Sequence, residues 1–197
     1  GLIDLLEANK IPAVFYDVGR TGRAMFNIRV NYKRGIEKIV NHLHSLGHRR
    51  LAFGSHHSAL GPTSERETAL FQAVQRLGKG VELRAVANQD GLEGGRAAAR
   101  ELFDSRFDPT AIICVNDVMA IGVLREARTR GLRVPGNVSV TGFDNIRLTE
   151  FTSPALTTVH IARDRIGAMV FKLLVEEAGA APEANGREVI VEPELVI

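Results

Sequence analysis

The sequence predicts an α/β fold built of repeated βα units with parallel strands. Apolar runs of about five residues alternate with longer stretches of helical spacing, which is typical of repeated βα units. Apolar residues make up 45% of the chain and charged residues 24%, the composition of a globular protein that can bury a core. The length of 197 residues permits one large domain or two small lobes.

Six segments are expected to form strands, because most of their residues are β-branched or apolar on both faces, as in buried parallel strands. They are Ala13–Tyr16, Leu51–Gly54, Val81–Ala87, Ala111–Val115, Ser139–Gly142 and Leu156–His160. Five longer segments carry an apolar stripe at helical spacing and are expected to be helices. They are Lys33–Leu46, Ser64–Leu77, Glu93–Ser105, Asp117–Arg130 and Asp164–Glu177.

Residues near the chain terminus and at the ends of the predicted helices indicate where helices and loops begin and end. Gly47 follows one predicted helix and Gly131 another, and glycine favours the left-handed backbone that ends a helix. Leu2–Ala8 resemble the last turns of a helix with no strand before it, so we expect an N-terminal part of the fold to be missing. The Ala, Gly and Pro-rich stretch 176–185 predicts a surface loop.

Composition argues against several classes of function. Twenty-five Lys and Arg against 23 Asp and Glu leave a net charge of +2, far from the basic excess of a module that grips DNA phosphates. No apolar run approaches the roughly 18 residues of a membrane span, and the first ten residues contain acids where a signal peptide would be basic. The single Cys114 excludes an intramolecular disulfide and CxxC chemistry. We therefore expect a cytoplasmic protein without a membrane partner.

Polar side chains follow five of the predicted strands. In an open parallel sheet, ligands bind beyond the carboxyl ends of the strands, where loops converge and helix N-termini offer N–H donors. The residues at these ends are Asp17, Ser55–His56, Asn88–Asp90, Asn116–Asp117 and Asp144–Asn145. Carboxylates and amides suit the hydroxyls of a neutral, sugar-like ligand. Alternatively, residues such as Asn116 and Asp117 simply cap the helices that follow them.

Other candidate features favour binding over catalysis. Arg66, in the first turns of a predicted helix, could point its guanidinium into the same crevice or lie on the surface. His44 and His48 have the spacing of metal ligands, but Gly47 between them ends the helix, so no metal site is expected. The motifs GxGxxG, GxxxxGK[ST], HExxH and GxSxG are absent, and no nucleophile pairs with a base. We expect no cofactor and no catalytic residue.

Several segments resemble the lactose and galactose repressor (LacI/GalR) family of transcriptional regulators. They are 11–17 (IPAVFYD), 42–53 (HLHSLGHRRLAF), 116–122 (NDVMAIG), 131–135 (GLRVP), 138–145 (VSVTGFDN) and 154–159 (PALTTV). The likeness covers nearly the whole chain and is most specific over 116–159. It implies a periplasmic-binding-protein-like effector domain, made of two doubly wound parallel-sheet lobes joined by three crossings, with a small molecule in the cleft.

The resemblance also implies boundaries and site residues. The first lobe would hold residues 1–30 and 160–191 and be incomplete at its N-terminus, and the second would hold 31–159 and 192–197. The family's helix-turn-helix headpiece would precede Gly1. Five residues fall on positions that commonly touch the effector, and Asp90 is expected beside them. The five are Asp17, Arg66, Asn116, Asp117 and Asp144. Arg66 would donate a bidentate pair to ligand oxygens, and the carboxylates would orient sugar hydroxyls.

Two departures from the family pattern affect these expectations. Ala69–Leu70 replace the usual glycine and aromatic residue after the arginine, which would alter packing. Gln89–Asp90 stand where many sugar-responsive members carry an aromatic side chain that stacks on the ligand. Phe15 or Tyr16 could take this role, although strand alternation turns only one of them to a given side. The class of ligand therefore stays open.

Three functions remain in play. The first is the effector-binding and dimerisation domain of a repressor, a homodimer that senses a small molecule, most simply a sugar, and controls binding of its headpiece to operator DNA. The second is a stand-alone solute receptor for sugar transport, and the third is an enzyme on the same type of sheet. We favour the first, because Gly47–Arg50 and the segment 116–159 are more similar to repressors than to exported receptors.

Overall fold

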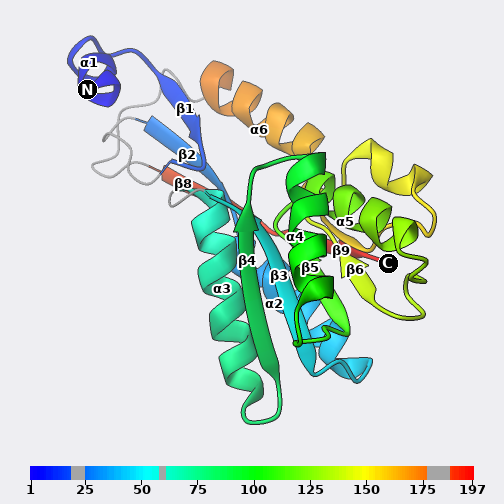
Figure 1. Cartoon of the computed structure of the whole chain (residues 1–197). Helices are drawn as coiled ribbons and strands as arrows, with labels where there is room; N and C mark the ends of the chain where they lie inside the picture. The colour runs from blue at the N-terminus through cyan, green and yellow to red at the C-terminus, as the bar shows by residue number, and fades with distance from the viewer. Residues whose placement is uncertain (19–24, 58–60, 177–186) are drawn as a thin grey trace. The chain divides into compact units, whose positions relative to one another are not determined.

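The computed structural model has the predicted α/β architecture and divides into two compact units (Figure 1). It describes residues 1–18, 25–57, 61–176 and 187–197, so the predicted loop at 176–185 lies almost wholly outside the described residues. Unit 1 comprises Gly1–Asn31 and Ile161–Pro193, and unit 2 comprises Tyr32–His160 and Glu194–Ile197. The chain passes from one unit to the other after Asn31, His160 and Pro193.

Unit 1 contains a three-stranded parallel sheet in the order β1-β2-β8. Its elements are α1 (Leu2–Ala8), β1 (Ala13–Tyr16), β2 (Met25–Val30), α6 (Arg163–Glu176) and β8 (Arg187–Val191). The helix α6 contacts β1 and β2 and buries Ile166 and Leu173, and Ile28 and Val191 from the strands are also buried. The helix α1 has no buried residue. The core of unit 1 is therefore small.

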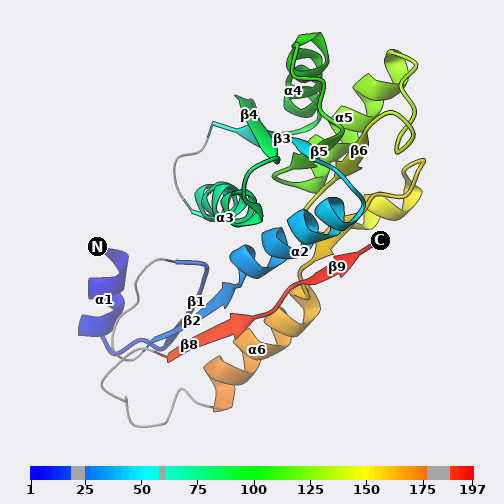
Figure 2. The same ribbon diagram turned by 90° about the horizontal axis from the view of Figure 1, so that it is seen from below.

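Unit 2 contains a four-stranded parallel sheet in the order β4-β3-β5-β6. The strands are β3 (Arg50–His56), β4 (Glu82–Asn88), β5 (Ala111–Cys114) and β6 (Ser139–Thr141). The helices are α2 (Tyr32–Ser45), α3 (Pro62–Leu77), α4 (Leu92–Asp104) and α5 (Asp117–Thr129). Figure 2 shows α4 and α5 on one side of the sheet and α2 and α3 on the other. This is the doubly wound arrangement that the resemblance to the repressor family implies, and its parallel strands are those that the alternation of strands and helices predicts.

The core of unit 2 lies between these layers. Phe53 on β3 and Ile112 and Ile113 on β5 are completely buried, and α2 contributes Ile36, Ile39 and Leu43 to the opposite layer. The helices α4 and α5 approach closely, because a Cβ atom on Gly95 would lie 2.1 Å from the Met119 carbonyl oxygen. Cys114 is buried in β5, where burial raises the pKa of its thiol, so it is an inert core residue.

Several elements differ from the sequence-based expectations. The strands β2 and β8, the short strand β9 (Glu194–Val196) and the 3-10 helix η1 (Arg147–Phe151) were not predicted. The expected strand 156–160 is shorter: β7 spans Thr158–His160 and pairs antiparallel with β9. This segment forms single parallel bridges, Thr141 to Thr157 and Asp144 to His160, with the chain around β6, and not a continuous ladder. None of the helices in the described ranges is long and apolar enough to cross a membrane.

His48 joins three elements at the amino-terminal edge of the unit 2 sheet. Its Nδ1 lies 3.0 Å from the Thr110 hydroxyl, before β5, and its Nε2 lies 3.1 Å from the Ser139 hydroxyl, at the start of β6. Partial burial, aided by the positive potential of His42, lowers the pKa of His48 from its ordinary value of 6.5. The folded chain thus favours the neutral imidazole, in which one nitrogen donates and the other accepts.

A pH titration of stability should reveal this preference. Because the pKa of His48 is lower in the folded state, the unfolded chain binds more protons below about pH 6.5, and stability falls as the pH drops through this region. Denaturant midpoints at several pH values measure the effect. The His48→Gln variant should show a flatter dependence between pH 7.5 and 5.5 than the wild type. Parallel curves for the two proteins would contradict the assignment.

Candidate functional site

Polar side chains gather at the carboxyl edge of the unit 2 sheet. They come from α3 and from the segments that follow β4, β5 and β6. Five of the six predicted site residues belong to unit 2: Arg66, Asp90, Asn116, Asp117 and Asp144. The sixth, Asp17, belongs to unit 1.

Arg66 has a buried side chain that several contacts hold in place at this edge. It is 7% exposed, its Nη1 donates to the Val115 carbonyl at 2.6 Å, and its Nη2 donates to Asp144 Oδ1 at 3.2 Å. Its guanidinium carbon lies 4.3 Å from the ring centroid of Phe143 and 4.7 Å from that of Tyr32. The buried Nε has no hydrogen-bond partner among the described residues. The alternative of a surface arginine is therefore wrong, and a fixed cation with spare donors stands at the edge.

Asp144 reaches Arg66 from an unusual turn after β6. Asp144 and Asn145 have φ angles of 115° and 51°, in the left-handed region that few residues other than glycine adopt. The turn is held by Asp144 N, which donates to the Val159 carbonyl, and by the Asn145 amide, which lies 3.1 Å from His160 Nδ1. The Asp144 side chain is 22% exposed. A carboxylate that is both paired and partly open can also accept hydrogen bonds from a ligand.

Asn116 was expected either to cap a helix or to lie in the binding site, and the structure bears on both interpretations. Its Oδ1 accepts a hydrogen bond from Met119 N at 2.8 Å, so it caps α5. Its Nδ2 donates to Asp90 Oδ1 at 2.9 Å, and Gly91 N donates to the same oxygen at 2.8 Å. The hydrogen bond from Asn116 lowers the pKa of Asp90, so this exposed carboxylate stays ionised. Asn116 is therefore a helix cap that also positions Asp90 at the edge.

Asp117 is turned into the protein. Its side chain is completely buried, Oδ1 accepts from the Thr158 hydroxyl at 2.5 Å, and Oδ2 accepts from Ile146 N at 2.8 Å. A Cβ atom on Gly142 would lie 2.2 Å from Asp117 Oδ1, so only glycine leaves room for the carboxylate. Asp117 thus braces the segment between β6 and β7, and Asn116 rather than Asp117 caps the helix.

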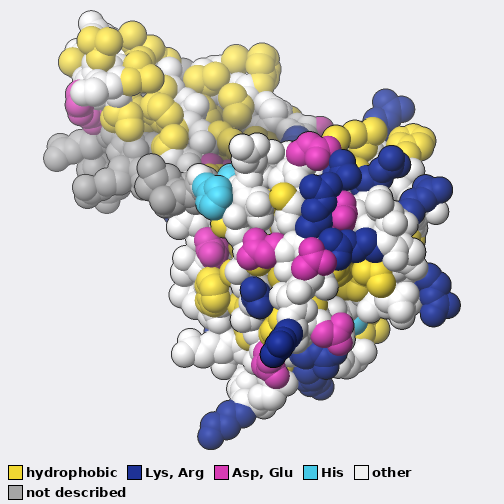
Figure 3. All heavy atoms as spheres, viewed as in Figure 1, with side chains coloured by type: hydrophobic (Ala, Val, Ile, Leu, Met, Phe, Trp, Pro, Cys, Tyr) yellow, Lys and Arg dark blue, Asp and Glu magenta, His cyan; other side chains and the backbone are white. Residues whose placement is uncertain are grey.

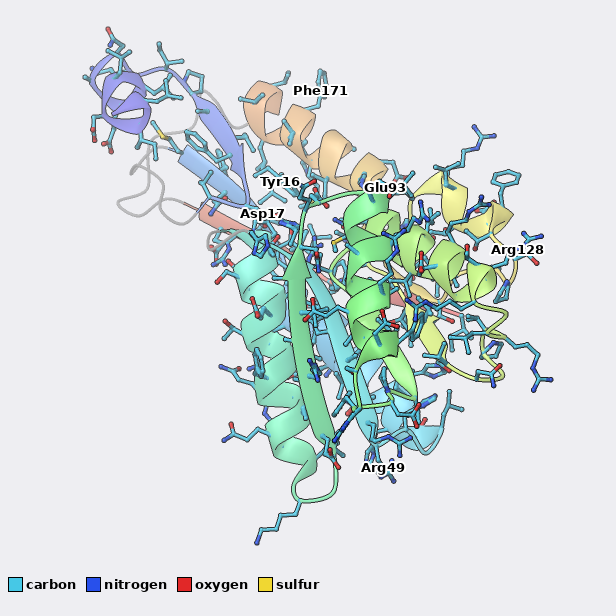
Figure 4. The ribbon with its side chains drawn as sticks, in the orientation of Figure 1. Tyr16, Asp17, Arg49, Glu93, Arg128 and Phe171 are labelled. Atoms are coloured by element: carbon cyan, nitrogen blue, oxygen red, sulfur yellow. The ribbon has the colours of Figure 1, made fainter. Side chains whose placement is uncertain are left out.

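Asp17 follows β1 in unit 1, beside the exposed Tyr16 (Figure 4). The Asp17 backbone is left-handed, with φ 51°, and its Oδ1 accepts from Val30 N at 3.0 Å. Its carboxylate therefore ties the end of β1 to the end of β2, within the same sheet.

Some residues at this edge had no assigned role in the sequence-based site. His56 Nε2 lies 3.0 Å from the Thr63 hydroxyl, and the Asn88 Nδ2 is buried with no hydrogen-bond partner among the described residues. His56 and Asn88 are the last residues of β3 and β4, so they lie at the strand ends where candidate binding residues are expected. The rings of Tyr32 and Phe143 are 3% and 0% exposed and lie under Arg66, so neither offers an open stacking face. No group of three or more His, Cys, Asp or Glu residues in the described ranges could hold a metal ion.

Comparisons of the sequence with known proteins point to a single protein family. A family model described as a periplasmic binding protein-like domain matches residues 40–197. The regulator MalR of Streptomyces coelicolor is 36% identical over 209 aligned positions, which cover 98% of this chain and 56% of MalR. The repressor CytR of Escherichia coli K12 is 35% identical and is matched over 80% of this chain and 46% of its own. The chain thus spans about half the length of these curated relatives.

Solved structures show the same fold. A LacI family regulator from Arthrobacter sp. FB24, in complex with lactose, superposes with a TM-score of 0.86 at 25% identity, covering 100% of this chain and 74% of that one. A LacI family regulatory protein from Chloroflexus aggregans gives a TM-score of 0.86 at 27% identity, covering 99% of this chain and 70% of that one. Both comparisons extend over both units.

Proposed function

Because the chain belongs to the LacI/GalR family as its periplasmic binding protein-like domain, we propose that it is the effector-binding and dimerisation part of a DNA-binding repressor. A helix-turn-helix segment outside this sequence would contact operator DNA in the cytoplasm, and a homodimer would place two such segments on paired half-sites. The two units would be the two lobes of the effector domain. Effector binding would act on DNA by favouring one of two states.

The arrangement around Arg66 is the observation that carries this proposal. A buried guanidinium with an unpaired Nε is paired with the partly open Asp144, and Asn116 holds the exposed carboxylate of Asp90 at the same edge of the sheet. Fixed donors and acceptors of this kind match a ligand with neighbouring hydroxyls. A sugar is the ligand class that we propose, and the lactose complex of the Arthrobacter relative supports it.

A thermal-shift panel tests the function. The chain is mixed with monosaccharides, oligosaccharides, polyols and purine nucleosides, each far above the expected Kd. A ligand at 100 times its Kd adds about 2.7 kcal/mol to stability and raises Tm by several degrees. We expect a saccharide to give this shift. A shift with a purine nucleoside alone would overturn the sugar assignment, and conversion of a bound saccharide into product would overturn the non-enzymatic function.

A further inference from the structure

Asp90 brings a negative charge to the carboxyl edge of the unit 2 sheet. Its carboxylate is exposed and ionised, and Oδ1 accepts from Asn116 Nδ2 at 2.9 Å and from Gly91 N at 2.8 Å. Asn116 is itself anchored, because its Oδ1 accepts from Met119 N. Within the described residues, Asp90 has no ion pair and its Oδ2 accepts no hydrogen bond. The described part of the chain thus fixes this charge in place without neutralising it.

Two arginines of this part of unit 2 are already engaged with other acids. Arg66 at the edge pairs with Asp144 at 3.2 Å. Arg96, on the helix α4 that follows Asp90, lies 3.1 Å from Glu93. Figure 3 shows the same pattern on the surface, where Lys and Arg side chains lie next to Asp and Glu side chains over α4 and α5. Because these charges cancel in pairs, Asp90 leaves the edge with an excess of negative charge.

Buried donors without partners indicate that a ligand binds at the same edge. The Nε of Arg66, a residue that is 7% exposed, and the Nδ2 of Asn88 have no hydrogen-bond partner among the described residues. Arg66 is bound to the Val115 carbonyl and Asp90 to the next residue, Asn116, so both charged groups flank the turn after β5. Buried polar groups in native proteins are usually paired. Acceptor oxygens of a bound molecule would therefore suit these donors.

From these observations, we propose that Asp90 makes the site select its ligand by charge, so that it admits neutral and amino saccharides and rejects phosphorylated ones. This inference rests on the proposed function and specifies the ligand of the same site. The open Oδ2 of Asp90 accepts a hydrogen bond from a hydroxyl or an ammonium group, whereas a phosphate meets a like charge. A phosphate site needs a free cation, and the arginine of this edge is already paired with Asp144.

Calorimetric titrations with matched ligands test this selection. The probes are glucose, galactose, ribose, maltose and trehalose, each beside its phosphate ester, together with glucosamine and galactosamine. A protonated His56 would attract Asp90, so the titrations run at about pH 8, at which free imidazole is neutral. For the saccharide that binds, we expect the phosphate ester to bind at least about tenfold more weakly than the neutral parent. The amino derivatives should show no such penalty.

The Asp90→Asn variant removes the charge and keeps the shape, because the amide oxygen can still accept from Asn116 and Gly91. The ratio between the Kd values of the phosphate ester and of the neutral parent should fall to about threefold or less. A merely structural role of Asp90 would weaken both ligands alike and leave this ratio unchanged. Asp108→Asn is the matched control, since Asp108 is an exposed acid that precedes β5 and pairs with Arg50, and it should keep the wild-type ratio.

The possible results separate the charge selection from the function itself. A phosphate ester that binds the wild type as tightly as its neutral parent would overturn the inference, and so would a ratio that Asp90→Asn does not change. Either result would leave the saccharide-binding function standing. If neither a neutral saccharide nor a phosphate ester binds, the proposed function is overturned together with the inference.

Discussion

The Asp117→Ala variant should lose about 3 kcal/mol of stability, because it leaves the buried Thr158 hydroxyl and the Ile146 N–H without their acceptor. Asp117→Asn should cost less. An amide oxygen can still accept from Ile146 N, and the amide nitrogen can donate to the Thr158 oxygen after that hydroxyl rotates. Urea denaturation at neutral pH measures both changes.

Asp90→Ala is the matched control for this experiment. Asp90 lies at the same edge of the sheet, but its carboxylate is exposed, so loss of its hydrogen bonds from Asn116 and Gly91 should cost only about 1 kcal/mol. Equal stability of the two alanine variants would show that Asp117 does not brace the segment 142–158. If the brace is real, loss of effector binding in Asp117→Ala reports a displaced Asp144 rather than a missing contact to ligand.

The difference between Asp117 and its neighbour shows what the sequence can and cannot predict. Asn116 is identified as a cap from local pattern alone, because its partner Met119 is three residues away. The direction of Asp117 depends on Thr158, which is 41 residues away, and on the missing side chain of Gly142. The spacing of residues within one short segment of the sequence cannot indicate a contact between segments so far apart. The rule that strand ends face ligands therefore located the edge but could not sort open carboxylates from buried ones.

The same distinction applies to the fold. The spacing of apolar residues predicts the helices α2 to α5 and the strands β3, β4 and β5. The observed bounds of these elements differ from the predicted bounds by a few residues. The strands β2 and β8 were missed because the prediction was based on continuous apolar runs, and polar residues interrupt β2 and begin β8. Asn27 and Arg29 interrupt the apolar residues of β2, yet Asn27 is buried because its amide donates to the Val18 carbonyl. Pairing of distant segments, rather than composition, makes these strands.

Arg66→Ala should weaken saccharide binding by about 2 to 5 kcal/mol, which corresponds to a factor between about 30 and several thousand in Kd. The guanidinium is held by the Val115 carbonyl and Asp144 before any ligand arrives, so its remaining donors are presented without a loss of side-chain freedom on binding. Its removal also leaves the Asp144 carboxylate without its cation. Arg66→Lys keeps the positive charge but lacks the planar, fork-shaped set of guanidinium donors. It should therefore retain only part of the wild-type affinity.

Titration calorimetry with the saccharide found in the thermal-shift panel measures these affinities. Arg76→Ala is the matched control, because Arg76 lies on the same helix but is exposed and pairs with Glu37 on α2. We expect it to bind as the wild type does. An unchanged affinity in Arg66→Ala, with the variant folded, would remove Arg66 from the site and leave the edge without its cation. Loss in Arg66→Ala together with partial binding in Arg66→Lys would identify the planar fork as the group that recognises ligand oxygens.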